Sequence, residues 1–262
     1  MSAAGEKPVD PRAALRDRAR IVGWGLALFA GVQALGVWLA KNHTGAVVAQ
    51  LVLAEFGTGR LAIAWSDPLA PEPTSKVIAA RAGLGAAIGA SAAVVLLGAA
   101  LALRRATIAE VSFSVSTLFV GAVVTGFAAA RDELLLRGLV LRALGPRASV
   151  GVRLAVCAAA GVAARFGADA AATPWSLAVA GLLAVGFSAL WIADRGAWLA
   201  WGANAAFSLV LGPLAQGAVL DVRATGAPLD AGPLGLAVAA AFAAFSVRRA
   251  LGREPRASSG DA

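Results

Sequence analysis

An apolar stretch from Ile108 to Ala130 runs directly into a charged run with the sequence RDELLLRG at residues 131–138. The stretch is long enough to cross a bilayer as a helix. At bilayer depth an Asp or Arg costs about 2.5–3.5 kcal/mol, whereas each Leu or Val returns only about 0.3–0.6 kcal/mol. The three leucines therefore do not offset the charges. The charged run must lie at the membrane interface or face a polar cavity inside a helix bundle.

The composition is that of a membrane protein. Hydrophobic residues make up 59% of the chain, and the mean hydropathy of +0.77 is too high for an ordinary soluble domain. We predict an all-α, polytopic integral membrane helix bundle with about eight transmembrane or re-entrant helices. The net charge of +8 does not indicate nucleic-acid binding, because the basic residues gather at the ends of apolar segments and tyrosine is absent. We expect no nucleic-acid partner.

The order of apolar and polar segments predicts the organisation of the chain. We expect a cytoplasmic basic segment (1–20), transmembrane helices (21–105), a core (106–216), a loop with the last transmembrane helix (217–247) and a cytoplasmic basic tail (248–262). The expected spans are 21–40, 77–103, 108–130, 150–165, 175–193, 197–216 and 232–247, with a short helix at 133–145. Segment 47–65 carries Glu55 and Arg60, so it either spans the membrane or is interfacial or re-entrant.

The positions of the basic residues predict the membrane topology, and those of small residues predict helix packing. Two basic ends imply an even number of crossings, with both termini in the cytoplasm, and Arg104-Arg105 reads as a cytoplasmic stop after 77–103. Gly85 and Gly89 form a GxxxG pair, which predicts close helix packing. Lysine is rare while Arg and Ala abound, which we associate with a bacterial genome. We therefore expect a multi-pass protein of the bacterial inner membrane.

Cys157 is the single cysteine of the chain. An intrachain disulfide and a cysteine-based zinc site are therefore excluded. We expect neither a metal nor a cofactor.

The charged run resembles a family signature. Asp132-Glu133-x-x-x-Arg137-Gly138 is similar to the Glu-Glu-x-x-x-Arg-Gly motif of the CPBP family, the CAAX-protease and bacteriocin-processing (Abi) membrane proteins, which include glutamic intramembrane endopeptidases. Downstream, the family spacing places Thr173-Pro174 at its Thr-Pro, Ala197-Trp198 at its Leu-Trp and Gly202 before its second histidine. The resemblance covers roughly residues 108–212.

The same spacing shows where this chain departs from the family. The leading Glu falls on Asp132, the first His on Phe166 (or on Ala170 in a second alignment), the second His on Asn204 and the terminal Asn on Ser208. Only Glu133 and Arg137 match. The sole histidine, His43, lies outside the resemblance.

The resemblance implies a carboxylate that activates water beside a scissile peptide. The Asp132 side chain is one methylene shorter than the Glu of the motif, so its carboxylate lies closer to the backbone. A misplacement of about 1 Å costs on the order of a hundredfold in rate. Asn204 offers one oxyanion hydrogen bond but cannot shuttle a proton, and Phe166 can do neither. Two hypotheses follow: an active, divergent endopeptidase that uses Asp132, Glu133, Asn204 and Ser208, or a catalytically impaired pseudoprotease. We favour the second, with membrane lipid and a membrane-anchored protein or peptide segment as partners.

Structural interpretations stand beside the catalytic ones. Glu133 precedes Arg137 by four residues, which favours an ion pair on one helix. Asn204 and Ser208 share a helix face and suit interhelical hydrogen bonding. Asp169 is a candidate partner of Asp132 in an aspartyl dyad, although no flanking motif supports it.

Overall fold

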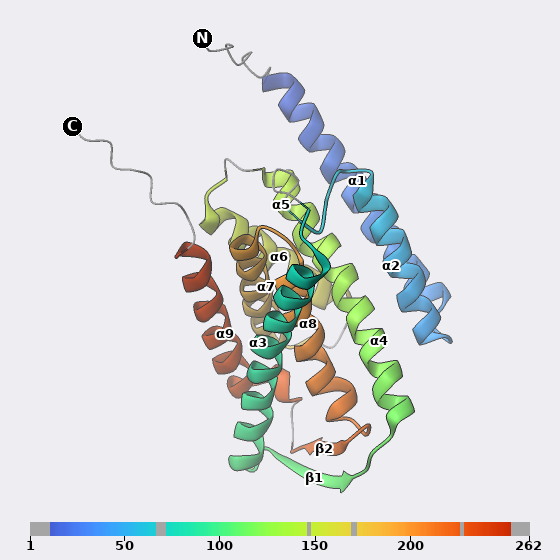
Figure 1. Cartoon of the computed structure of the whole chain (residues 1–262), viewed down its shortest axis with the longest axis vertical. Coiled ribbons are helices and arrows are strands. Elements are labelled where there is room, and N and C mark those ends of the chain that lie inside the picture. Colours follow the sequence, from blue (N-terminus) through green and yellow to red (C-terminus); the bar gives the residue numbers. More distant parts are fainter. Residues whose placement is uncertain (1–10, 67–71, 146–147, 169–171, 226–227, 253–262) are drawn as a thin grey trace, which may run out of the picture.

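The computed structural model describes residues 11–66, 72–145, 148–168, 172–225 and 228–252, and it is a helix bundle with a small two-stranded sheet (Figure 1). This confirms the predicted all-α membrane bundle. The α-helices are α1 (Pro11–Trp38), α2 (His43–Gly59), α3 (Ser75–Ala102), α4 (Val115–Asp132), α5 (Leu139–Leu144), α6 (Val150–Ala168), α7 (Pro174–Asp194), α8 (Trp198–Leu209) and α9 (Pro233–Leu251). The remaining elements are the π-helices η1 (Glu133–Gly138) and η2 (Val210–Leu214), the 3₁₀ helix η3 (Leu229–Ala231), and the strands β1 (Ala106–Val111) and β2 (Leu220–Ala224).

Five helices among the described residues are long and apolar enough to cross a membrane. They are Leu15–Trp38 in α1, Ser75–Ala102, Val150–Gly167 in α6, Pro174–Asp194 and Pro233–Leu251. The apolar helix Trp198–Leu214 is shorter, and α2 packs along both α1 and α4. A multi-pass membrane protein follows from these helices.

The backbones of helices α3 and α8 are in direct contact. A Cβ atom at Gly85 would collide with the carbonyl oxygen of Leu199, and one at Gly89 with that of Ala203. From the other side, Gly202 of α8 lies against the carbonyl oxygen of Ala82. The predicted packing role of the GxxxG pair is confirmed, since only glycine leaves room for this contact.

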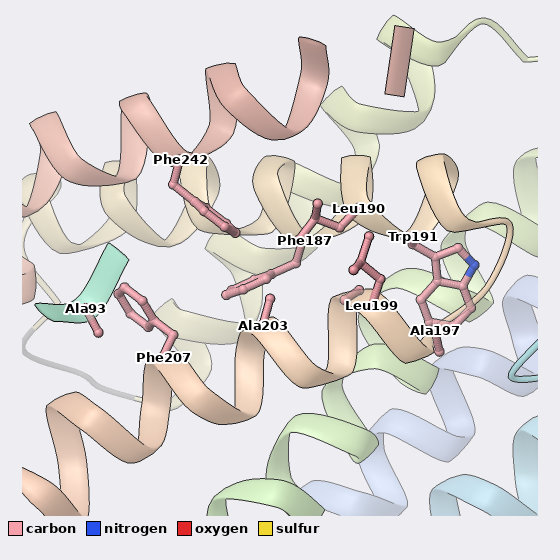
Figure 2. Close-up of a cluster of buried hydrophobic side chains, with 10 residues drawn as sticks. Ala93, Phe187, Leu190, Trp191, Ala197, Leu199, Ala203, Phe207 and Phe242 are labelled. Atoms are coloured by element: carbon pink, nitrogen blue, oxygen red, sulfur yellow. The ribbon is translucent and has the colours of Figure 1, made fainter. Parts of the chain in front are cut away.

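The largest buried cluster lies between α3, α7, α8 and α9 (Figure 2). Phe187 of α7 stands at its centre, with ring centroids 5.0 Å from Phe242 of α9 and 6.4 Å from Phe207 of α8. Leu190 and Leu199 are almost completely buried beside these rings. The cluster holds α7, α8 and α9 together and fixes the side of α8 that carries Asn204.

The structure corrects the expected span at 108–130. Residues 106–111 form β1, which pairs antiparallel with β2, and α4 begins only at Val115 with Ser114 as its N-cap. The backbone N–H groups of Ser112 and Ser114 donate to Val219 and Ala218, so this part of the chain is tied to a segment more than 100 residues away. A long-range pairing of this kind leaves no local signal in an apolar sequence.

The span and the short helix expected at 133–145 form one continuous helical segment. The chain stays helical from Val115 to Leu144 because the π-helix η1 joins α4 to α5. The doubtful segment 47–65 divides into the end of α2 and a turn, after which Ser66 forms a β-bridge with Gly196. Within the basic segment expected at 1–20, residues 11–20 form the first turns of α1.

The start of α1 and the end of α9 both lie at the end of the bundle opposite the β1–β2 sheet (Figure 1). Arg104 and Arg105 lie between α3 and β1, at the sheet end. The bundle thus separates these arginines from both ends of the described chain, so the expected stop does not lie at the same end of the structure as the termini.

Candidate functional site

The matching residues of the family motif form a buried ion pair in η1. Arg137 Nη1 donates to Glu133 Oε1 at 2.6 Å, and the two side chains are 7% and 0% exposed. Asn204 Nδ2 of α8 donates to the same oxygen at 3.2 Å. The Arg137 guanidinium also lies over the ring of Phe187, 5.0 Å from its centroid. The structure therefore shows the predicted Glu133–Arg137 pair, with Asn204 and Phe187 completing its surroundings.

The pair lies on a π-helical turn, a type of distortion that is often found at functional sites. Within the turn the Leu139 N–H donates to the carbonyl oxygen of Leu134, five residues earlier. Gly138 closes the turn where a Cβ atom would lie 2.8 Å from Ile63 and 3.0 Å from Trp191. The Gly of the motif thus has a packing role, because it lets the helix resume against α7 and the turn after α2.

Asp132 is bound to its neighbour Arg131. Arg131 donates from Nη2 and Nε to Asp132 Oδ1 at 2.7 and 2.8 Å, and the carboxylate is 34% exposed. Arg131 Nη1 also donates to Gln50 Oε1 at 2.6 Å, and Gln50 Nε2 donates to the Val32 carbonyl at 2.9 Å. This chain of contacts ties the candidate base of α4 to both α2 and α1. Sequence reasoning missed Gln50, since nothing local marks it as a partner of residue 131.

A cavity of about 400 Å³ lies beside these groups, between α1, α4, η1, α6, α7 and α8. Its polar lining consists of Gln33, Arg131, Asp132, Arg137, Arg165, Asn204 and Ser208. Three of the four candidate catalytic residues, Asp132, Asn204 and Ser208, therefore meet in one cavity. Glu133 is fully buried next to the lining. Three arginines and one carboxylate make the lining basic, and the sequence did not point to Arg165.

The first histidine position of the resemblance does not reach this cavity. Phe166 is 65% exposed, while its neighbour Arg165 lines the cavity. Asp169 and Ala170 lie outside the described residues, so the proposed dyad and the second alignment stay predictions. His43 is exposed at the start of α2 and is not part of the lining.

The other residues that carry the resemblance have structural roles. Thr173 is the N-cap of α7, where its Oγ1 accepts from the Ser176 N–H at 3.2 Å, and Pro174 occupies the first turn. Trp198 opens α8 and donates to Ser66 Oγ at 3.1 Å, and its ring stacks on Trp65. These contacts fix where α7 and α8 begin. The start of α8 in turn fixes the position of Asn204 along the bundle.

The arrangement limits what the cavity can do chemically. The contacts of both carboxylates fall on one oxygen each: Arg131 binds Asp132 Oδ1, and Arg137 and Asn204 bind Glu133 Oε1. Glu133 Oε2 is buried and has no hydrogen-bond partner among the described residues. Each carboxylate is thus held beside a positive charge, which favours its ionised form and weakens it as a base. An oxyanion hole needs donors that point at the developing charge, whereas one amide N–H of Asn204 already serves Glu133. Among the described residues, His, Cys, Asp and Glu side chains do not gather in groups of three that could hold a metal ion.

Comparison with protein-family models, with curated proteins and with solved structures found no match to this chain.

Proposed function

We propose that this chain is a membrane-embedded binding protein of the CPBP type that has lost peptidase chemistry and holds a membrane-anchored peptide segment in its polar cavity. One observation carries the proposal: both carboxylates of the motif are engaged by arginines, Asp132 by Arg131 and Glu133 by Arg137. A buried ion pair with a further amide donor keeps its geometry, since breaking it would leave an unpaired charge. The cavity is thus better suited to bind than to transfer protons.

The lining suits the polar end of a peptide in an apolar setting. Arg131, Arg137 and Arg165 present guanidinium groups, and Asn204 and Ser208 add amide and hydroxyl groups. Arginine binds carboxylates and backbone carbonyls through a planar array of donors. Leu183 and Phe207 provide apolar walls on α7 and α8.

A photo-crosslinking residue at Leu183, which lines the cavity, tests this proposal in the native membrane. We expect it to capture a defined apolar or membrane-anchored peptide segment, identified by mass spectrometry. The same residue at Ala178, on the exposed side of α7, is the matched control and should not give that adduct. The adduct should persist in an Asp132→Asn background and disappear when Ala180→Phe fills the cavity. Equal capture from positions 183 and 178 would refute the proposal.

A second candidate is an active endopeptidase in which Asp132 is the base and Asn204 the oxyanion donor. The observation in its favour is that Asp132, Asn204 and Ser208 line the same cavity. In that case Asp132→Asn would abolish a cleavage and let uncleaved substrate accumulate.

We further propose the bacterial inner membrane as its location, with both termini in the cytoplasm. The segment 1–20 carries Lys7, Arg12, Arg16, Arg18 and Arg20, and the tail adds four more arginines. Both ends of the described chain leave the bundle opposite the sheet, so one orientation satisfies the positive-inside rule for both (Figure 1).

A further inference from the structure

A second and larger hollow lies on the side of the bundle between α1 and α6. Its volume is about 730 Å³, and η1 and α5 form its floor. The lining is apolar except for one charged residue, Arg18. Val22 and Leu26 of α1 and Val156 of α6 are exposed along it, so this groove faces the lipid.

The groove has the length of one bilayer leaflet. It follows α1 from Arg18 to Phe29, and the eleven helical steps between these residues correspond to roughly 16 Å. Half of a hydrocarbon core about 30 Å thick is about 15 Å. An apolar, lipid-facing groove of this length suits an acyl chain that runs along α1.

The charge at the groove's end favours an anionic headgroup. Arg18 forms no ion pair with the residues that the structure describes, because the nearby Asp17 pairs with Arg20 at 2.8 Å. Arg18 also lies near the start of α1, and α1 begins at the end of the bundle opposite the β1–β2 sheet (Figure 1). Basic residues between helices at the cytoplasmic surface bind anionic lipid headgroups.

We propose that this groove is a binding site for one anionic phospholipid, with its phosphate at Arg18 and an acyl chain along Leu26, Leu139 and Ala160. The site does not depend on the proposed peptide function. It is nevertheless adjacent to the polar cavity, since Phe29, Leu135, Leu136 and Ala164 line both. The end of the bound chain therefore reaches the wall of that cavity.

Native mass spectrometry of the full chain in detergent tests the site, with palmitoyl-oleoyl phosphatidylglycerol and the matching phosphatidylcholine as probes. We expect one phosphatidylglycerol to be retained in preference to phosphatidylcholine. Arg18→Gln should lower the affinity for phosphatidylglycerol roughly fivefold and remove the preference. Arg18 is exposed, so this variant should fold normally.

Two further variants distinguish a specific lipid site from nonspecific attraction of anionic lipid to the basic protein. Lys76→Gln removes an equal charge at the start of α3, outside the groove, and should leave retention unchanged. Ala160→Phe fills the groove and should reduce retention of both lipids. No preference in the natural chain, or a Lys76→Gln effect as large as that of Arg18→Gln, would overturn the proposal. Unchanged retention in a folded Ala160→Phe variant would also overturn it.

Discussion

Glu133 Oε1 lies 2.6 Å from Arg137 Nη1, and both side chains are buried in the interior of the bundle. The two residues that match the family motif therefore bind each other, with Asn204 donating to the same oxygen. Asp132 and Arg137 of the same charged run line the polar cavity beside this pair.

Replacing one residue of the Glu133–Arg137 pair should destabilise the protein, whereas replacing both should cost much less. Arg137→Met leaves a buried carboxylate without its partner and should lower the free energy of unfolding by roughly 3–5 kcal/mol. Glu133→Gln should do the same by stranding the guanidinium. The double variant should recover most of the loss, as measured by denaturant unfolding in micelles.

The exposed pair Asp17–Arg20 provides the control for that experiment, and Asp17→Asn should change the unfolding free energy by no more than about 0.5 kcal/mol. A double variant as unstable as the sum of its single variants would show that the pairing is not what stabilises this region.

The contact between α3 and α8 should not tolerate a side chain at Gly89. Gly89→Val pushes a β-branched group into the backbone of Ala203 and should cost about 3 kcal/mol or more. Gly98→Val is the matched control, because the same helix has open space there. Thermal melting of the purified variants measures the difference. Equal melting temperatures would refute the close contact.

Arg131 and Gln50 should be energetically coupled across the α2–α4 contact. Gln50 is buried and binds both Arg131 and the Val32 carbonyl, so Gln50→Leu removes the hydrogen bond from Arg131 Nη1 and the one to the Val32 carbonyl. A double-mutant cycle with Arg131→Met should give a coupling of about 0.5–3 kcal/mol. Additive effects of the two substitutions would show that the contact is not formed in the membrane.

The orientation of the bundle can be read with single cysteines in a Cys157→Ala background. A membrane-impermeant maleimide added to intact cells should label Glu110→Cys in β1. It should label Glu72→Cys, between α2 and α3, only after lysis. The reverse pattern would place the termini outside the cytoplasm.

Features set by local sequence were predictable. The Glu133–Arg137 pair follows from a four-residue spacing, and the contact at Gly85 and Gly89 follows from a four-residue repeat of small residues. The apolar helices follow from length and hydropathy, with ends that differ by several residues.

What escaped prediction depends on contacts between distant segments. Strand β1 exists because it pairs with residues 220–224, and without that partner its sequence reads as the start of a span. Gln50 is 81 residues from Arg131, and no spacing rule connects them. The exposure of Phe166 depends on which face α6 turns to α7, which its alanine-rich sequence leaves open.

The most direct test of the central claim compares the termini of membrane proteins in cells that carry the natural chain, the Asp132→Asn variant or neither. Because Asp132 is bound by Arg131, we predict that no new terminus depends on that carboxylate. The three samples should then show the same set of cleavage products. A product present with the natural chain and absent with Asp132→Asn, at equal membrane levels of the two proteins, would contradict the account.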